Sequence, residues 1–412
     1  MSSRRTFIRQ ALGGSAALAA SGLFPSSRVL GANDRVRLGL IGGGGRGQQI
    51  FKTALSCHNV EGVAVADVYT RRLEEVKSFV PSIKTYHEFR ELLDDKSIDA
   101  VLIATPQHQH ALNFVPAIEA GKDVYQEKTM AFNPDHAKRM RKALEGSGRI
   151  VQIGIQSTSG PAVAGVREHL TAEKMGTITQ IHTHHYRNDP YGGWKRPLPA
   201  DCDLQHVDWK SFQGEAKEYP FDPNRVINWR FYNDYSGGNV FENMVHQVGF
   251  WFKLMNLGIP LKVTMTGDNY LSPHMQLPDT MDVSMNLPNK MLFTWNSMFG
   301  NSVFGEGDDY VLGNKGTIFR DENECVRYAP QGRASGEGTL AALKAAKGAD
   351  IVGVDDITVP HMQNFIDCVR SRKQPNCPLE IGFRSAIACQ MAVASYRQGR
   401  TVRWDEKRED IV

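Results

Sequence analysis

The chain has 412 residues, with 48 lysines and arginines against 45 aspartates and glutamates, and a formal charge of +3. Four of the arginines and none of the acids lie in residues 1–32, so the rest of the chain carries 44 basic and 45 acidic side chains. This balance gives no reason to expect nucleic acid or an anionic membrane as a partner. The length after residue 32 exceeds one typical domain, so we expect two.

The N-terminus resembles an export signal. Residues 3–8 read SRRTFI, with the arginine pair Arg4-Arg5, and the apolar run ALGGSAALAASGLF follows. This run is too short to span a membrane. We therefore predict a twin-arginine signal peptide over residues 1–32, with cleavage near Ala32, and export to the periplasm or beyond. A disordered, slightly basic N-terminus is the alternative.

Short apolar runs alternate with amphipathic stretches up to residue 155. The runs predict strands at 36–41, 60–66, 99–104, 122–126 and 150–154. Helices are expected near 46–56, 70–79, 87–94, 108–120 and 133–146. This alternation is typical of a doubly wound parallel sheet, so residues 33–155 are predicted to form a Rossmann domain in an α/β protein.

A glycine loop follows the first predicted strand directly. Residues 36–47 read VRLGLIGGGGRG, which places Gly42, Gly44 and Gly47 at G-x-G-x-x-G spacing. Such glycines allow a tight turn, close approach of the backbone to a pyrophosphate, and close packing of helix on strand. The next strand ends at Asp67, 20 residues after Gly47, where a dinucleotide fold places its ribose-binding carboxylate. We predict NAD as the cofactor; NADP stays possible because Arg71 and Arg72 follow closely.

Two further motifs stand at the carboxyl ends of predicted parallel strands, where open α/β sheets bind ligands. One is ATPQHQH over residues 104–110, and the other is Gln126-Glu127-Lys128-Thr129. Lys128 is placed to reach the nicotinamide side of the cleft, although its position alone would favour a surface lysine.

The pattern changes after about residue 160. Alternating segments separated by turn residues predict a large, mainly antiparallel open sheet with one face covered, within a C-terminal α/β domain over 156–412. One helix is expected at about 239–257, with Asn239 as its N-cap. Two late helices, at 360–372 and 381–398, could pack back on the first domain, and 333–352 reads as a surface loop with one helical turn.

The helix at 239–257 carries Glu242 and His246 at i,i+4 spacing, so both side chains share one face. The pair could bind a metal, but no third ligand is evident, since the adjacent His184 and His185 point to opposite faces of a strand. We expect no metal. The six cysteines show no metal-binding spacing; Cys368 and Cys377 could form a disulfide, but buried thiols are favoured.

Together these motifs resemble the Gfo/Idh/MocA oxidoreductases over residues 35–405. FQG at 212–214, NWRFYNDYSGGNVFENMVHQ at 228–247 and SYRQGRTVRW at 395–404 resemble one bacterial subgroup of that family. The resemblance implies a Rossmann domain, a C-terminal domain whose open sheet makes homo-oligomer contacts (a dimer or tetramer), and a bound NAD(P). It places the cofactor against Gly42, Gly44, Gly45, Arg46, Gly47, Asp67, Thr105, Pro106, His110, Glu127 and Lys128.

The same resemblance assigns catalytic roles. Lys128 matches the lysine of an E-K-P motif and would orient the substrate hydroxyl, His246 matches the acid/base histidine, and Glu242 stands where the family usually has an aspartate that pairs with that histidine. Two departures follow. Thr129 replaces the proline of the motif, and Glu242 is one methylene longer than aspartate.

The substrate is expected to be a sugar or a cyclitol. Aromatic faces and hydrogen-bond donors suit such molecules, and candidate contacts are Lys128, Tyr186, Arg187, Trp229, Arg230 and His246. The leading prediction is an exported NAD(P)-dependent oxidoreductase acting on CH–OH groups. The alternatives are an NAD-dependent glycosidase or lyase that oxidises its substrate transiently, and a non-catalytic sugar-binding protein that holds a nucleotide.

Overall fold

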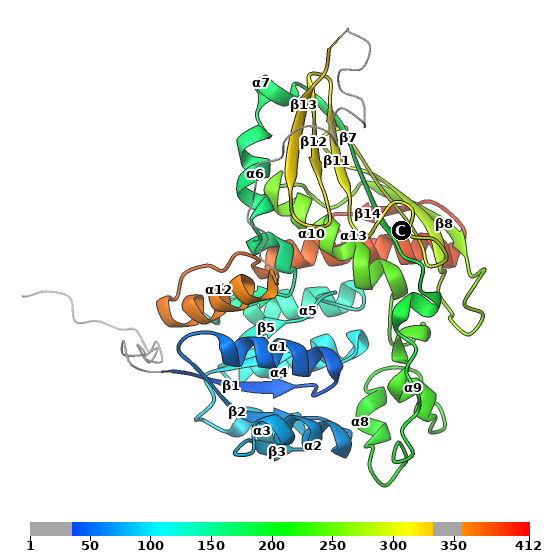
Figure 1. The fold of residues 1–412 in the computed structure, drawn as a ribbon. Coiled ribbons are helices and arrows are strands. Elements are labelled where there is room, and N and C mark those ends of the chain that lie inside the picture. The colour runs from blue at the N-terminus through cyan, green and yellow to red at the C-terminus, as the bar shows by residue number, and fades with distance from the viewer. Residues whose placement is uncertain (1–34, 333–355) are drawn as a thin grey trace, which may run out of the picture. The chain divides into compact units, whose positions relative to one another are not determined.

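The computed structural model describes residues 35–332 and 356–412 (Figure 1). The predicted signal peptide and the predicted loop at 333–352 lie outside these residues. Within the described residues, no helix is both long and apolar enough to cross a membrane.

The first part of the chain forms a six-stranded parallel sheet in the order β3-β2-β1-β4-β5-β6. Its strands are β1 (Val36–Ile41), β2 (Val60–Ala66), β3 (Lys84–Tyr86), β4 (Ala100–Ile103), β5 (Asp123–Gln126) and β6 (Val151–Ile153). The predicted doubly wound sheet is confirmed, and the strand ends differ by at most one residue. β3 was not predicted, because three residues are too few to show an apolar pattern.

Helices connect these strands. They are α1 (Gly45–Ser56), α2 (Thr70–Phe79), α3 (Phe89–Asp94), η1 (Gln107–Gln109), α4 (His110–Glu119), α5 (Pro134–Leu144) and, after β6, η2 (Gln156–Ser159). The start of α5 shows how sequence sets such boundaries. The Asn133 side chain accepts a hydrogen bond from the His136 N–H, and Pro134 occupies the first turn, where its missing N–H is not needed.

The second part contains a nine-stranded sheet in the order β13-β12-β11-β7-β10-β9-β8-β14-β15. Its strands are β7 (Ile178–Tyr186), β8 (Lys262–Asp268), β9 (Thr280–Asn286), β10 (Leu292–Met298), β11 (Asp309–Gly313), β12 (Gly316–Arg320), β13 (Val326–Pro330), β14 (Val402–Asp405) and β15 (Asp410–Ile411). All neighbours pair antiparallel except β7 and β10, which are parallel. The expected mainly antiparallel sheet is confirmed.

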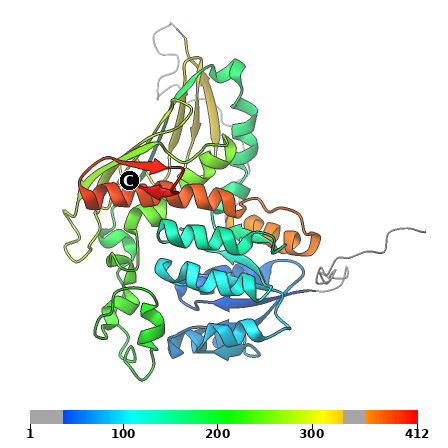
Figure 2. The ribbon, with the colours of Figure 1, turned by 180° about the vertical axis from the view of Figure 1, so that it is seen from behind.

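One face of this sheet is covered by helices. The helix expected at 239–257 is a π-helical turn, η5 (Val240–Met244), continued by α10 (Val245–Leu254). The late helices are α12 (Thr358–Ser371) and α13 (Leu379–Gln398). α13 packs against β8 and α10 on one side and against α5 and β6 on the other, while α12 packs against α1. Figure 2 shows α13 between the nine-stranded sheet and α5, so these helices join the two sheets.

Two smaller helices, α6 (Ala162–His169) and α7 (Ala172–Met175), precede β7 and pack against β12 and β13. Between β7 and η5 lies a long connection, residues 187–239, which we call the 187–239 segment. It contains η3 (Pro190–Gly193), α8 (Trp209–Gln213), α9 (Pro223–Ile227) and η4 (Trp229–Phe231). Its apolar side chains, among them Trp209, Phe212 and Tyr235, form a small core with Tyr69, which lies between β2 and α2. The segment therefore folds onto the Rossmann part of the chain.

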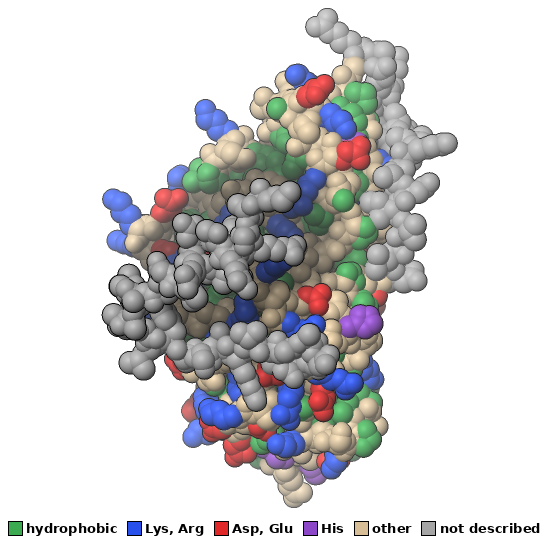
Figure 3. All heavy atoms as spheres, turned by 90° about the vertical axis from the view of Figure 1, so that its left-hand side faces the viewer, with side chains coloured by type: hydrophobic (Ala, Val, Ile, Leu, Met, Phe, Trp, Pro, Cys, Tyr) green, Lys and Arg blue, Asp and Glu red, His purple; other side chains and the backbone are tan. Residues whose placement is uncertain are grey.

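Acidic and basic side chains are mixed on the surface. Figure 3 shows one face, on which Lys and Arg side chains lie close to Asp and Glu side chains across the lower part. This distribution agrees with the near-zero charge of the chain after residue 32. Cys368 and Cys377 are buried thiols, and no disulfide joins them in the described residues.

Candidate active site

The glycine loop has the geometry that its spacing predicts. Gly42 has φ +93°, and a Cβ there would lie 2.8 Å from the backbone of Ala104 and Thr105. A Cβ on Gly47 would lie 1.9 Å from the carbonyl oxygen of Gly42, so α1 packs directly on the turn. Gly44 and Gly45, in contrast, face open space within 4 Å. The first turn of α1 therefore presents free backbone N–H groups to an open cleft, as a pyrophosphate site requires.

Asp67 lies beside this loop at the end of β2. Its carboxylate accepts hydrogen bonds from the N–H of Gly43, at 2.7 Å, and of Tyr69, at 2.9 Å. Burial raises the pKa of Asp67 to about 6, although these two N–H groups act in the opposite direction. The two backbone bonds fix the carboxylate at the edge of the cleft.

A cavity of about 740 Å³ runs along the loop. From the predicted cofactor residues it is lined by Gly42, Gly44, Gly45, Arg46, Asp67, Thr105 and Pro106. From the 187–239 segment it is lined by Trp194, Arg196, Pro197, Pro199, Trp229 and Arg230, among others. The cavity is thus built from the Rossmann part on one wall and from this segment on the other.

The 104–110 motif contributes mostly supporting contacts. Gln107 donates to Glu242 at 2.8 Å, and Gln109 donates to the carbonyl oxygens of Ser211 and Phe212 at the end of α8. Both ring nitrogens of the buried His110 face carbonyl oxygens, those of Thr129 and Thr105, at 2.7 and 3.0 Å. His110 does not line the cavity; it joins the ends of β4 and β5.

Glu127 is also a supporting residue. Its side chain is nearly buried and forms an ion pair with Arg46 at 2.9 Å, while Arg46 itself lines the cavity. Among the predicted cofactor residues, Glu127 therefore acts by holding the guanidinium group of Arg46 at the start of α1.

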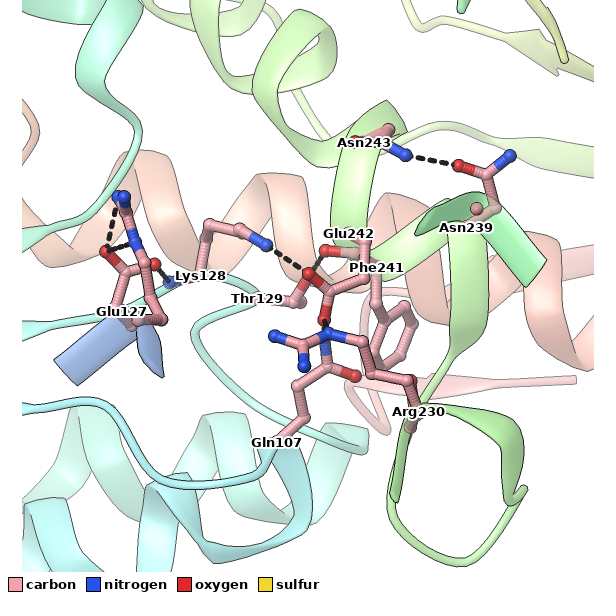
Figure 4. A network of polar contacts seen from close by, with 12 residues as sticks. Gln107, Glu127, Lys128, Thr129, Arg230, Asn239, Phe241, Glu242 and Asn243 are labelled. Carbon is pink, nitrogen blue, oxygen red and sulfur yellow. Dashed lines mark hydrogen bonds and ion pairs between the residues drawn. The ribbon is translucent and has the colours of Figure 1, made fainter. Parts of the chain in front are cut away.

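Lys128 meets Glu242 at the centre of the site, as Figure 4 shows. Its Nζ lies 2.6 Å from Oε2 of Glu242, and the other carboxylate oxygen lies 3.1 Å from Nε of Arg230 and accepts the hydrogen bond from Gln107. Burial alone would raise the pKa of Glu242, but Arg230 and Lys128 outweigh it and lower this pKa to about 2. Glu242 is therefore a permanent anion that positions two cations.

Thr129 has a role that the proline of the family motif cannot fill. Its hydroxyl donates to the carbonyl oxygen of Phe241, at 2.8 Å, and so ties the loop after β5 to the π turn that carries Glu242 (Figure 4). The expected capping by Asn239 is wrong: its side chain donates to Ser297 and accepts from Asn243, because the helix begins with a π turn whose end is packed against β10.

His246 is a partly buried residue on α10. Desolvation lowers its pKa well below the usual value, and the nearby positive charges of Lys128 and Arg46 lower it further. The imidazole is thus neutral at neutral pH and able to accept a proton. The hydrogen bonds and ion pairs described for Glu242 go to Lys128, Arg230 and Gln107, so the supposed pairing of Glu242 with His246 is replaced by one with Lys128.

The remaining substrate candidates lie apart from one another. Trp229 and Arg230 line the cavity, and the Arg230 guanidinium stacks on the Trp229 ring at 4.2 Å. Tyr186 and Arg187, at the end of β7, are not among its lining residues. Arg187 contacts His185 at 2.6 Å and Glu306 at 3.2 Å.

Sequence reasoning did not assign Gln107 to the site, although it quoted the motif that contains it. The signal was its place immediately after β4, at the sheet edge where ligands bind. No group of three or more His, Cys, Asp and Glu side chains suited to a metal ion occurs in the part of the chain that the structure describes.

The parallel sheet, the glycine loop and the fixed carboxylate define a Rossmann nucleotide-binding protein. Residues 36–155 match the model of the oxidoreductase family with an NAD-binding Rossmann fold, named GFO_IDH_MocA. The match bears out the resemblance seen in the sequence for these residues.

Several proteins of known name are similar to the chain. Inositol 2-dehydrogenase of Salmonella paratyphi B is 26% identical over 179 residues, covering 42% of this chain and 52% of that protein. The chain thus spans about half the length of the first curated relatives it matches. The scyllo-inositol 2-dehydrogenase (NAD(+)) of Bacillus subtilis is 29% identical over 367 residues, covering 84% and 89%.

A third relative has a different chemistry in its name. A glycosyl hydrolase family 109 protein of Stenotrophomonas maltophilia is 36% identical over 124 residues, covering 27% of each chain. Among solved structures, levoglucosan dehydrogenase in complex with NADH and levoglucosan superposes with a TM-score of 0.70 at 17% identity, covering 90% of this chain and 99% of that one. This last likeness shows the fold of both sheets.

Proposed function

We propose that this chain is an NAD(H)-dependent oxidoreductase that transfers hydride between the cofactor and a hydroxyl-bearing carbon of a sugar or cyclitol. One observation carries the proposal. Arg230 lines the cavity beside the glycine loop and is ion-paired with Glu242, which in turn holds Lys128. A nucleotide cavity and a proton-handling cluster therefore adjoin at one place.

The cavity fits a dinucleotide. Gly44 and Gly45 leave open space at the start of α1, where backbone N–H groups would hold the pyrophosphate. Asp67 would accept hydrogen bonds from the ribose hydroxyls, and Arg46, held by Glu127, stands at the phosphate end. When bound, the nicotinamide supplies the hydride acceptor or donor.

The chemistry left to the protein is proton transfer. Oxidation of a carbinol needs removal of the hydroxyl proton, and His246 is the side chain that we assign to accept it; its imidazole is neutral, but its lowered pKa makes it a weaker base than an ordinary histidine. The Lys128 ammonium, aimed by Glu242, stabilises the alkoxide that develops on the substrate oxygen. Trp229 and Arg230 offer an aromatic face and hydrogen-bond donors, which match the C–H faces and hydroxyl edges of a sugar ring.

The names of the relatives support a cyclitol or sugar as substrate, since two of them are inositol dehydrogenases. To test the cofactor, the purified protein is denatured and the released nucleotide is identified by liquid chromatography. We expect NAD or NADH. NADP(H) as the main species would overturn the choice of cofactor, and a protein that neither contains nor binds either nucleotide would overturn the proposal.

A glycosidase or lyase that oxidises its substrate transiently is the second candidate, favoured by the similarity to a glycosyl hydrolase family 109 protein. The two are distinguished by mixing the nucleotide-loaded protein with a panel of aryl glycosides. Release of aglycone without net reduction of the cofactor supports the glycosidase, whereas reduction without release supports the oxidoreductase. A protein that binds nucleotide and sugar and does neither would be a binding protein.

We also propose that the protein is exported by the twin-arginine route, on the strength of Arg4-Arg5 and the apolar run behind them. This route carries folded proteins and so suits one that takes up its nucleotide in the cytoplasm. Changing both arginines to lysine should retain the protein inside the cell. Equal export of the double variant in a fractionation experiment would contradict the proposal.

A homo-oligomer is proposed as well. Large apolar side chains are exposed on loops beside the nine-stranded sheet, including Val303 at 74% and Tyr270 at 70%. Such side chains favour a protein interface when they gather in one area. Light scattering on the eluting protein should give the mass of a dimer or tetramer, and a monomeric mass at micromolar concentration would contradict this.

A further inference from the structure

We propose that Asp201, a residue of the 187–239 segment, makes the protein selective for NAD over NADP by holding Arg71 away from the 2′ position of the adenosine ribose. The inference rests on the proposed function and adds a selectivity residue that lies far from the glycine loop in sequence. It concerns only the end of the cavity that would hold the adenosine ribose of the cofactor.

Arg71 is ion-paired with Asp201 through two of its guanidinium nitrogens. Its Nε lies 2.8 and 3.0 Å from the two carboxylate oxygens, and Nη2 lies 2.8 Å from one of them. The hydroxyl of Tyr69 donates to the same carboxylate at 2.7 Å. A guanidinium group engaged by a carboxylate in this way has fewer free donors and less net charge to offer a phosphate.

Arg72, the other arginine after β2, is also paired with an acid. Its Nη1 lies 2.8 Å from Oε2 of Glu75, which further accepts a hydrogen bond from Gln48. In Rossmann proteins an arginine near this position accommodates the 2′-phosphate of NADP, and an acid at the end of β2 binds the ribose hydroxyls of NAD. Here the acid, Asp67, is present and each of the two arginines is paired with another acid.

The position of Asp201 does not depend on the ion pair. The 187–239 segment is joined to the chain around Arg71 by backbone hydrogen bonds: Thr70 N–H donates to His206, and Asp208 N–H donates to Val68. Tyr69 and Val207 also form an antiparallel bridge. Because exposed ion pairs contribute little to stability, we expect removal of the Asp201 charge to leave the fold intact.

Two walls meet at this end of the cavity. Asp67, Tyr69 and Arg72 line one wall, and Pro197 and Pro199, just before Asp201 in the chain, line the other. A phosphate on the 2′ oxygen would therefore approach the carboxylate of Asp67, whereas Arg71 and Asp201 do not line the cavity but are close in the chain to Arg72 and Pro199, which do. Removing the charge of Asp201 frees Arg71 to reach the phosphate, while Asp67 still favours NAD.

The test uses Asp201→Asn, with Glu218→Gln as the control, because Glu218 is an exposed acid of the same segment. Dissociation constants for NAD and NADP are measured by equilibrium dialysis on the full-length protein. In the Asp201→Asn variant, the affinity for NADP relative to NAD should rise on the order of 10-fold, the effect of one charge-assisted contact. The control should keep the wild-type ratio.

A second variant assigns the gain to Arg71. Arg71→Gln added to Asp201→Asn should return the ratio to the wild-type value, whereas Arg71→Gln alone should change it little. An Asp201→Asn variant with the same ratio as the control would overturn the inference, as would a gain that survives Arg71→Gln. A wild-type protein that binds neither nucleotide is a separate result and contradicts the proposed function itself.

Discussion

At the scale of single residues, the site is organised around the Glu242 carboxylate. It holds the Lys128 ammonium at 2.6 Å and the Arg230 guanidinium at 3.1 Å, and Gln107 completes its hydrogen bonds. The family motif has an aspartate at this position, and glutamate is one methylene longer. In this structure the Glu242 carboxylate is paired with Lys128. In this network Glu242 does not pair with His246, the histidine that we propose acts on the substrate.

We expect Lys128 and His246 to be needed for turnover but not for binding of the nucleotide. In the variants Lys128→Ala and His246→Ala, we expect nucleotide affinity to stay within a few-fold of wild type, because the glycine loop and Asp67 hold the cofactor. Turnover should fall on the order of 100- to 10,000-fold, the usual effect of losing a positioned acid/base group. Steady-state kinetics and nucleotide titration check both values, with Lys77→Ala, on the exposed side of α2, as the control. Near-normal turnover of His246→Ala would make this histidine structural.

Glu242→Gln should damage both stability and catalysis. The change leaves two largely buried cations without their anion, and breaking a buried pair typically costs about 3–5 kcal/mol. Since Lys128 is no longer aimed, kcat should fall more than the substrate KM changes. Thermal unfolding and kinetics are the measurements, and Glu61→Gln on the exposed side of β2 is the control. A Glu242→Gln protein as stable and active as the control would show that the carboxylate is dispensable.

Much of the site was predictable from residue type and spacing, but its connections were not. The sequence located Lys128, Glu242 and Arg230, and local spacing suggested a Glu242–His246 pair. The observed partners come from three separate elements, after β4, after β5 and at η4. The i,i+4 spacing predicts only which side chains are neighbours on the same helix. It cannot predict contacts with residues of other elements.

At the scale of elements, two glycines of the glycine loop have different roles: we expect Gly47 to be needed for folding and Gly44 for nucleotide binding. Gly47→Ala should destabilise the protein strongly, because the added Cβ would lie 1.9 Å from the Gly42 carbonyl oxygen. Gly44→Ala should fold normally, since open space surrounds the position and its φ is −68°, yet it should weaken NAD binding because the Cβ enters the cleft. Melting temperature and nucleotide titration distinguish the two. Equal melting temperatures for both variants would contradict this packing.

Element prediction succeeded where apolar patterns are long and failed where tertiary contacts decide. The strands from β1 to β6 were found apart from β3, and the late helices were placed within about two residues. The π turn η5 and the short helices of the 187–239 segment were missed. A single π turn leaves no periodic apolar pattern in the sequence by which it could be predicted. The helices of the 187–239 segment are short, and the segment is held by its contacts with the Rossmann part.

At the scale of the whole molecule, buried histidines make stability depend on pH. Burial lowers the pKa of His108 to about 4 and those of His185 and His361 to about 3, while His110 and His246 are shifted in the same direction. The unfolded chain binds protons at these sites below about pH 6.5 and the folded chain does not, so stability falls as the pH drops.

The opposing contribution is smaller. Asp67, with its pKa raised to about 6, and Glu324, whose pKa is also raised by burial, stabilise the fold as the pH falls, but they are two groups against the five histidines named above. We therefore expect the melting temperature to decrease steadily from pH 7 to pH 4. Scanning calorimetry over this range is the check. A melting temperature that stays constant or rises towards pH 5 would show that the buried histidines take up protons in the folded state.

The most direct test of the central claim is a single-turnover experiment on the nucleotide-loaded protein. The protein carrying NAD is mixed rapidly with each member of a panel of inositols and aldoses, and the absorbance of reduced nicotinamide is followed. The account predicts that at least one of these polyols reduces the bound NAD in wild type, that the rate collapses in His246→Ala, and that the nucleotide stays bound in both. A protein that binds NAD but in which no polyol of the panel reduces it, nor the matching ketone oxidises bound NADH, would contradict the account.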